Sequence, residues 1–213
     1  MGIRKDAIMK SKSALVLEEL RSKLRTASVA QVGGFRPTAD PITSWFLKGV
    51  ALPGEGLPVW KGQPMFPLLQ IRVDELPVIP EQLKGIALLV LYHNMESHPF
   101  DKPHGEGWLI REYATLDGLE LLPAINTPYR AFPVRWVSVN DDAPGWEDAW
   151  DIIDLSDVND DEDASNRFYD GFNRYRGTKV GGYPMEIQHG VGIQDFVFQV
   201  GSEEKVNWMW ADN

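Results

Sequence analysis

The sequence contains no cysteine, which excludes disulfide bonds, thiolate metal sites and cysteine nucleophiles. It also lacks an apolar run near the roughly 20 residues that a membrane-spanning helix needs. No apolar stretch with a small-residue cleavage site follows the basic N-terminus, so a secretory signal is not expected. We predict a cytoplasmic protein with no membrane partner.

Signatures of known catalytic machinery are missing as well. The chain has no phosphate-binding glycine loop of the Walker or dinucleotide type. It has no Gly-x-Ser-x-Gly nucleophile elbow. We therefore assign no catalytic residue and expect no cofactor. The composition is that of an ordinary globular protein, because 43% of the 213 residues are hydrophobic and 24% are charged.

The net charge of −10 is concentrated in one stretch of the chain. Residues 141–170 hold twelve acidic residues and one base, Arg167, so this segment carries −11 and the rest of the chain +1. A protein that binds nucleic acid directly usually carries a basic stripe, which this chain lacks. The acidic segment is expected to repel nucleic acid and to attract a basic partner.

The pattern of apolar residues predicts an α+β fold. Leu17, Leu20 and Leu24 recur at helical spacing, which indicates an amphipathic N-terminal helix over residues 6–26. Residues 93–107 read as a polar hairpin loop, residues 145–153 as a helix, and residues 157–163 as an Asp-rich loop. Short runs rich in Val, Ile and aromatic residues predict strands, and they cover Phe66–Val73, Ile86–Tyr92, Trp108–Tyr113, Phe132–Val139, Phe196–Val200 and Val206–Trp210.

A short pattern occurs twice. Val32-Gly33-Gly34-Phe35 precedes a strand containing Gln70, and Val180-Gly181-Gly182-Tyr183 precedes a strand containing Gln199. We interpret this as an internal duplication of one β-rich unit whose two halves share a core. Each glycine pair is expected to need positive φ or a close backbone approach. A buried glutamine in either strand must bind backbone groups.

On these motifs the sequence resembles the YwqG-like family, a bacterial family without an established function. The resemblance covers residues 30–213 and rests on Val32–Phe35, Pro64–Ile71 followed by Glu75–Pro77, Gly85–Tyr92, Lys179–Pro184 with Ile187-Gln188, Phe196–Gln199 and Asn207–Asp212.

The resemblance implies an α+β fold of two similar β-rich halves. Together with the residue patterns above, it predicts a single domain with the N-terminal helix at 6–26, the first half at 30–140, the acidic segment at 141–170 and the second half at 171–213. It also implies association with bacterial toxin systems. The family usually continues with a Gly-rich final strand, whereas this sequence stops at Asn213. We therefore expect an edge strand that is open to pairing.

The leading hypothesis is a non-enzymatic immunity protein that binds and neutralises a bacterial toxin with a basic active-site cleft, such as a nuclease. The carboxylates of the acidic segment would imitate the charge of a phosphate backbone, and Trp146 and Trp150, on one helical face, would supply an anchor. The proposed partner-binding residues are Asp141, Asp142, Trp146, Glu147, Asp148, Trp150, Asp151, Asp154, Asp157, Asp160, Asp161, Glu162 and Asp163.

Other chemistries receive less support from the sequence. Asp157, Asn159 and Asp161 are spaced like the start of a calcium loop, but the required glycine and the final acidic ligand are missing. The histidines of the 93–107 loop lack the spacing of a helical zinc site, so no metal site is predicted. The alternative function is an enzyme or small-molecule-binding protein with a pocket between the two halves, lined by Tyr183, Gln188, Trp208 and Trp210.

Overall fold

The computed structural model describes residues 11–40, 42–96, 98, 102–185 and 193–210. The chain divides into two compact units, each built from segments that are distant in sequence. The helical unit comprises Met1–Thr26, Asn140–Tyr175 and Gly182–Phe196, and the sheet unit comprises Ala27–Val139, Arg176–Gly181 and Val197–Asn213. The fold is mixed α/β and rich in strands, as the sequence predicts.

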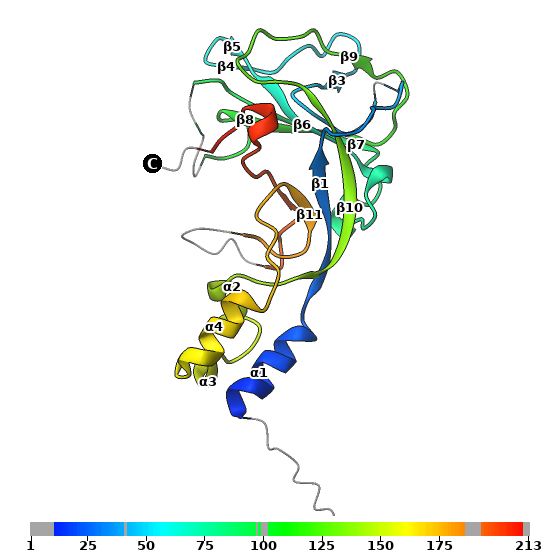
Figure 1. The fold of residues 1–213 in the computed structure, drawn as a ribbon. Helices are drawn as coiled ribbons and strands as arrows, with labels where there is room; N and C mark the ends of the chain where they lie inside the picture. The colour runs from blue at the N-terminus through cyan, green and yellow to red at the C-terminus, as the bar shows by residue number, and fades with distance from the viewer. Residues whose placement is uncertain (1–10, 41, 97, 99–101, 186–192, 211–213) are drawn as a thin grey trace, which may run out of the picture. The chain divides into compact units, whose positions relative to one another are not determined.

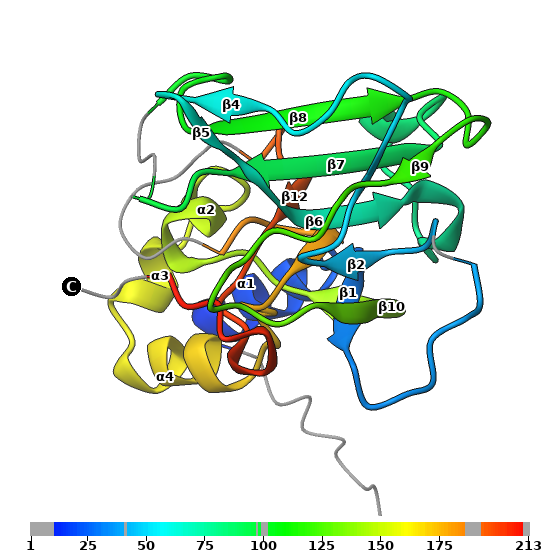
Figure 2. The same ribbon diagram turned by 90° about the horizontal axis from the view of Figure 1, so that it is seen from above.

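The sheet unit is organised around an eight-stranded, curled sheet (Figures 1 and 2) with the order β12-β11-β1-β10-β2-β6-β7-β8. Two small two-stranded antiparallel sheets, β3 with β9 and β4 with β5, accompany it. The strands are β1 (Arg25–Val32), β2 (Trp45–Phe46), β3 (Val50–Ala51), β4 (Val59–Trp60), β5 (Gln63–Pro64), β6 (Phe66–Arg72), β7 (Leu88–His93), β8 (Trp108–Tyr113), β9 (Glu120–Leu121), β10 (Phe132–Asp142), β11 (Lys179–Gly181) and β12 (Phe198–Gln199).

Strand β7 explains how the sheet unit buries its core. All six of its residues are buried, because the strand lies between β6 and β8 and apolar side chains cover both faces of the sheet there. One face contributes Leu89 and Leu91 to a core with Phe66 and Trp208, while the other contributes Val90 and its neighbours to a second core. The continuous apolar run at Ile86–Tyr92 therefore correctly predicts a strand that is buried on both sides.

The helical unit contains α1 (Lys12–Arg21), α2 (Trp146–Trp150), α3 (Ser156–Asn159) and α4 (Glu162–Asp170). Ser11 caps α1, since its hydroxyl accepts the backbone N–H of Ala14 at 3.2 Å. The four helices share a small core that includes Leu20, Leu155, Val158 and Phe168, all of them fully buried. Three short 3-10 helices, η1 (Val73–Glu75), η2 (Glu81–Leu83) and η3 (Glu204–Val206), complete the elements of the described chain.

Three boundaries predicted from the sequence are wrong. Arg25 and Thr26 open β1 and do not continue the N-terminal helix, although α1 lies within the predicted range. Residues 157–163 form parts of α3 and α4 and not a loop, because Asp161 serves as a helix cap. Residues 206–210 form no strand: Val206 ends η3, and Trp208 makes a single bridge with Glu203.

The repeated Val-Gly-Gly pattern has the predicted backbone but different surroundings. All four glycines have positive φ, from 58° at Gly33 to 78° at Gly182. The buried Gln70 side chain donates to the carbonyl of Thr43 at 2.6 Å. In the sheet, β11 pairs directly with β12, whereas β10 and β2 lie between β1 and β6. The two copies therefore occupy different neighbourhoods, and the duplication stays a prediction.

Candidate functional site

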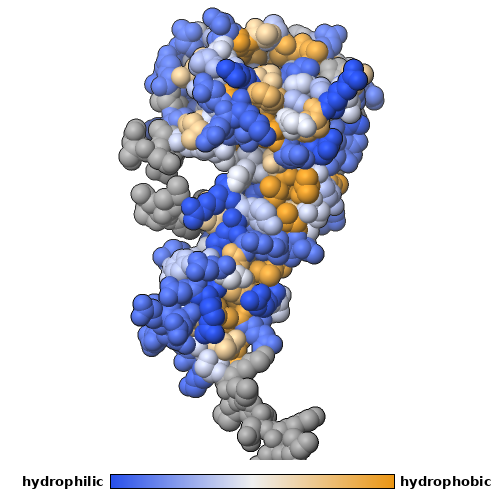
Figure 3. Space-filling view, viewed as in Figure 1, coloured by the Kyte–Doolittle hydropathy of each residue, from blue (hydrophilic) through white to orange (hydrophobic). Residues whose placement is uncertain are grey.

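The acidic segment presents most of its carboxylates to solvent. On the face drawn in Figure 3, hydrophilic residues cover α3 and α4. Among the residues that the structure describes, none of the exposed carboxylates of this segment forms an ion pair within 4 Å, so no described basic side chain neutralises their negative charge. These exposed acids are Glu147, Asp151, Asp154, Asp157, Asp160, Glu162, Asp163 and Asp170.

Three aromatic side chains lie among these acids. Trp146 stacks on Tyr169 with ring centroids 5.6 Å apart and contacts Trp150 edge-on at 6.1 Å. Trp146 also packs against the buried ring of Phe168, which fixes the cluster to the core of the helical unit. Trp150 and Tyr169 remain 38% and 55% exposed. The i,i+4 spacing of the two tryptophans thus places them together, as predicted, with one ring anchored and one open to solvent.

Four of the predicted partner-binding acids are buried or bind groups within the chain. Asp142 is fully buried, and its two oxygens accept the backbone N–H groups of Tyr175 at 3.2 Å and Tyr183 at 2.8 Å. Asp148 is buried as well. Buried carboxylates cannot contact a partner, so the prediction that Asp142 and Asp148 belong to a partner-binding surface is wrong.

The other two acids are partly exposed and hold neighbouring segments together. Asp141 accepts the side-chain amide of Asn173 at 2.6 Å and the hydroxyl of Tyr175 at 3.0 Å. Asp161 caps α4 through the N–H of Ala164 and accepts the hydroxyl of Ser13 at 2.6 Å. The Ser13 hydroxyl and the Ala164 N–H lower the pKa of Asp161, because both stabilise its charged form.

The alternative site predicted from the sequence is distributed over both units. Tyr183 lies in the helical unit, where its hydroxyl donates to the carbonyl of Lys23 at 2.6 Å and Arg25 covers its ring at 4.2 Å. Trp208 is 1% exposed and belongs to the core of the sheet unit. Gln188 lies outside the described residues. Trp210 lines a cavity, which is the pocket of the sheet unit described next.

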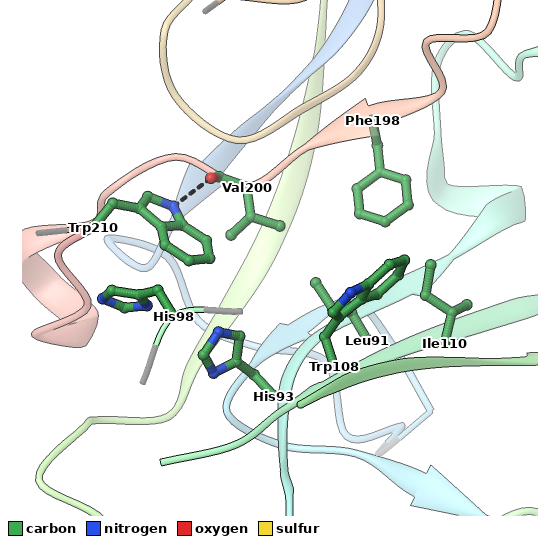
Figure 4. Close-up of a pocket in the computed structure, with 8 residues that line it drawn as sticks. All are labelled: Leu91, His93, His98, Trp108, Ile110, Phe198, Val200 and Trp210. Atoms are coloured by element: carbon green, nitrogen blue, oxygen red, sulfur yellow. Dashed lines mark hydrogen bonds between the residues drawn. The ribbon is translucent and has the colours of Figure 1, made fainter. Parts of the chain in front are cut away.

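An aromatic pocket of about 430 Å³ opens in the sheet unit (Figure 4). Leu91 and His93 of β7 lie directly opposite Ile110 and Trp108 of β8 in the antiparallel register. Since residues two apart in a strand share a face, these four side chains form one wall. The remaining lining residues of the aromatic pocket are His98, Phe198, Val200 and Trp210. The sequence analysis did not predict this pocket. The alternation of side chains along β7 and β8 could have indicated that their four lining residues share a face.

His93 is the buried titratable group of the aromatic pocket. It is 3% exposed, and burial lowers its pKa from 6.5 to about 4. Its Nδ1 lies within hydrogen-bonding distance of the carbonyl oxygen of Asn94. A carbonyl accepts only, so Nδ1 carries the proton and Nε2 is left as an acceptor. Within the described part of the chain, Nε2 has no hydrogen-bond partner.

The structure supplies no metal centre among the residues it describes. No group of three or more histidine, aspartate or glutamate side chains is close enough there to hold an ion. The calcium-like spacing of residues 157–161 falls on α3 and the cap of α4. No helix in the described part of the chain combines the length and the apolar character needed to cross a bilayer.

Comparison with models of protein families finds no match for this sequence, and comparison with curated proteins finds no similar sequence. The fold and the two sites therefore have to be interpreted from their own residues, and the resemblance to the YwqG-like family stays a prediction.

Proposed function

We propose that this chain is a non-catalytic interaction protein that binds a basic protein through the acidic surface of its helical unit. The acidic surface consists of the exposed carboxylates of residues 147–170 together with Trp150 and Tyr169. The observation that carries the proposal is the combination of unpaired charge with exposed aromatic rings that are anchored to a core.

The carboxylates and the aromatic rings of the acidic surface contribute differently to binding. Unpaired carboxylates attract an oppositely charged partner over several ångströms and raise the rate of encounter. Exposed tryptophan and tyrosine rings supply apolar contact area at low entropic cost and are the residue types that dominate binding energy. Because Trp146 is held by Phe168 and Tyr169, its neighbour Trp150 is presented in a defined position.

We further propose that the partner is a toxin, as the resemblance implies, and that its basic surface normally binds nucleic acid. Carboxylates on adjacent helices imitate the density of negative charge along a phosphate backbone. By occupying the basic cleft of a nuclease, such a surface excludes the substrate and neutralises the enzyme without any chemistry. Asp142 and Asp141, which accept hydrogen bonds within the helical unit, then stabilise the segments that carry this surface and make no contact with the partner.

The test is charge reversal with a matched control. Asp157→Lys/Asp160→Lys/Asp163→Lys reverses three exposed acids of the acidic surface, while Glu106→Lys/Asp117→Lys/Glu120→Lys reverses three exposed acids of the sheet unit. Both variants have the same net charge. Tagged proteins are used to capture partners from the native host lysate at low and high salt. Each captured protein is then assayed for nuclease activity with and without added chain.

We expect the unaltered chain and the sheet-unit variant to capture and inhibit the same basic nuclease at low salt. The acidic-surface variant should lose both properties, and high salt should weaken capture for all three proteins. Equal capture by the two variants would contradict the proposal, and so would a captured protein whose activity the chain leaves unchanged.

A further inference from the structure

The aromatic pocket of the sheet unit is independent of the acidic surface and carries an inference of its own. Its lining comes from β7 and β8 at one end of the sheet order and from β12 at the other end. Its volume of about 430 Å³ falls within the range of small-molecule sites. Figure 4 shows the rings of Trp108, Phe198 and Trp210 around a shared space.

The polar atoms of the two indole rings are already used. Trp108 Nε1 donates to the carbonyl of Lys102 at 2.8 Å, and Trp210 Nε1 donates to the carbonyl of Val200 at 2.5 Å. Neither indole N–H is therefore free to bind a ligand. What the tryptophans offer is ring surface, which favours a flat, apolar molecule.

No carboxylate, lysine or arginine lines the aromatic pocket. Its titratable lining residues are the histidines His93 and His98, and burial keeps His93 neutral at physiological pH. A charged ligand would lose its hydration without gaining a counter-charge. The lining therefore selects a neutral molecule.

His93 contributes a polar atom that remains to be satisfied. His93 Nε2 is an acceptor without a partner in the described part of the chain, and Figure 4 shows that the ring edge away from the backbone points toward Trp210 and the shared space. Buried polar groups are nearly always hydrogen-bonded, so an orphan acceptor beside a cavity indicates a missing donor. Because Nε2 exposes almost no surface, the surrounding rings must shift slightly to admit that donor.

We propose that the aromatic pocket binds a neutral, flat aromatic molecule carrying one hydroxyl or N–H group, which donates to His93 Nε2 while the rings of Trp108 and Trp210 enclose its apolar body. The proposal does not depend on the acidic surface, because every residue it uses belongs to the sheet unit.

Three probes with one ring system test this proposal on the unaltered chain at neutral pH. 2-Naphthol is neutral and has a donor, 2-methoxynaphthalene is neutral without a donor, and 2-naphthoate is charged. Calorimetry measures each affinity, and tryptophan fluorescence reports the shift of the rings. We expect 2-naphthol to bind at least tenfold more tightly than 2-methoxynaphthalene and 2-naphthoate not to bind. No binding of 2-naphthol, or binding of 2-naphthoate with equal affinity, would overturn the proposal. Equal affinity for the two neutral probes would overturn the role of His93.

A pair of variants places the binding site. Val200→Trp fills the aromatic pocket from its rim, whereas Val137→Trp adds the same side chain at an exposed position of β10, where Val137 is 45% exposed. We expect 2-naphthol binding to be lost in the first variant and retained in the second. Retained binding in Val200→Trp would contradict the assignment. If that variant fails to fold, the comparison of probes on the unaltered chain still decides the matter.

Discussion

The helical unit and the sheet unit bury their apolar side chains in different ways. The helical unit has a small core under short helices, and much of its surface is left to carboxylates. The sheet unit buries β6 and β7 on both faces, and its partly buried aromatic residues gather around a cavity. One unit therefore offers unpaired negative charge, which suits a basic macromolecule, and the other offers uncharged ring surface, which suits a small apolar molecule.

The same contrast exists within the acidic segment. Asp142 and Asp157 are both aspartates of this segment, yet Asp142 is buried and bonded to two backbone N–H groups, while Asp157 is exposed at the start of α3. A run of acidic residues is therefore not one functional unit. Part of it holds the helical unit together, and part of it forms the acidic surface.

Replacing Asp142 gives the largest expected effect. Asp142→Ala leaves the buried N–H of Tyr183 and the N–H of Tyr175 without their acceptor, so we expect a loss of about 3 kcal/mol in the free energy of unfolding. Asp157→Ala, at an exposed site, should change it by no more than about 0.5 kcal/mol. Urea denaturation of both variants measures the difference. Equal effects would remove the distinction between supporting and surface carboxylates.

The pH dependence of stability tests the buried histidine of the sheet unit. The folded protein holds His93 neutral down to about pH 4, whereas the unfolded chain binds the proton near pH 6.5. The unfolded state therefore gains protons first as the pH falls, and stability decreases across this window. We expect a loss of about 2 kcal/mol between pH 6.5 and 5 that is absent from His93→Phe. A similar decline in His93→Phe would show that other groups are responsible.

Replacing Trp150 is expected to affect partner binding more than folding. Trp150→Ala removes an exposed ring from the acidic surface and should weaken binding of the captured partner about tenfold, or about 1.4 kcal/mol. Leu15→Ala removes a side chain that is 52% exposed on α1 of the same unit and serves as the control. Calorimetric titration compares the two. An unchanged affinity in Trp150→Ala would leave the carboxylates without an apolar anchor.

The smallest effect concerns the turn after β1 in the sheet unit. Gly34 has a φ of 76° and open space around it, so Gly34→Ala should cost about 1 kcal/mol through backbone conformation alone. Gly177 also has open space but no left-handed φ, and Gly177→Ala should be neutral or stabilising by about 0.5 kcal/mol. Thermal unfolding of both variants checks the expectation. A neutral Gly34→Ala would show that the turn does not require glycine.

Local patterns in the sequence predicted much of the fold. The apolar runs located β6, β7, β8 and β10, and the glycine pairs correctly predicted four positive φ angles. Strand β1 was missed because its residues, Arg25–Val32, mix polar and small side chains without clear alternation. Helices α3 and α4 were missed because Asp161 looked like one more loop acid, whereas it is a cap whose role depends on the N–H of Ala164.

The candidate sites were predictable to different extents. The acidic surface is contiguous in sequence, so its charge and its paired tryptophans could be read directly. The burial of Asp142 depends on contacts that are distant in sequence, such as the hydrogen bond from the backbone N–H of Tyr183, 41 residues away. No local sequence pattern contains that information. The aromatic pocket brings Leu91 and Ile110 together with Phe198 and Trp210, so it exists only once the sheet has curled.

Hydrogen exchange tests whether the partner binds to the acidic surface. Amide exchange is measured on the unaltered chain, alone and bound to the basic nuclease captured from the host. We predict that protection is concentrated in residues 146–170, which carry the exposed acids and Trp150. Unchanged exchange there, with new protection at an edge of the sheet such as β8 or β12, would show that the partner binds to the sheet unit and not to the acidic surface.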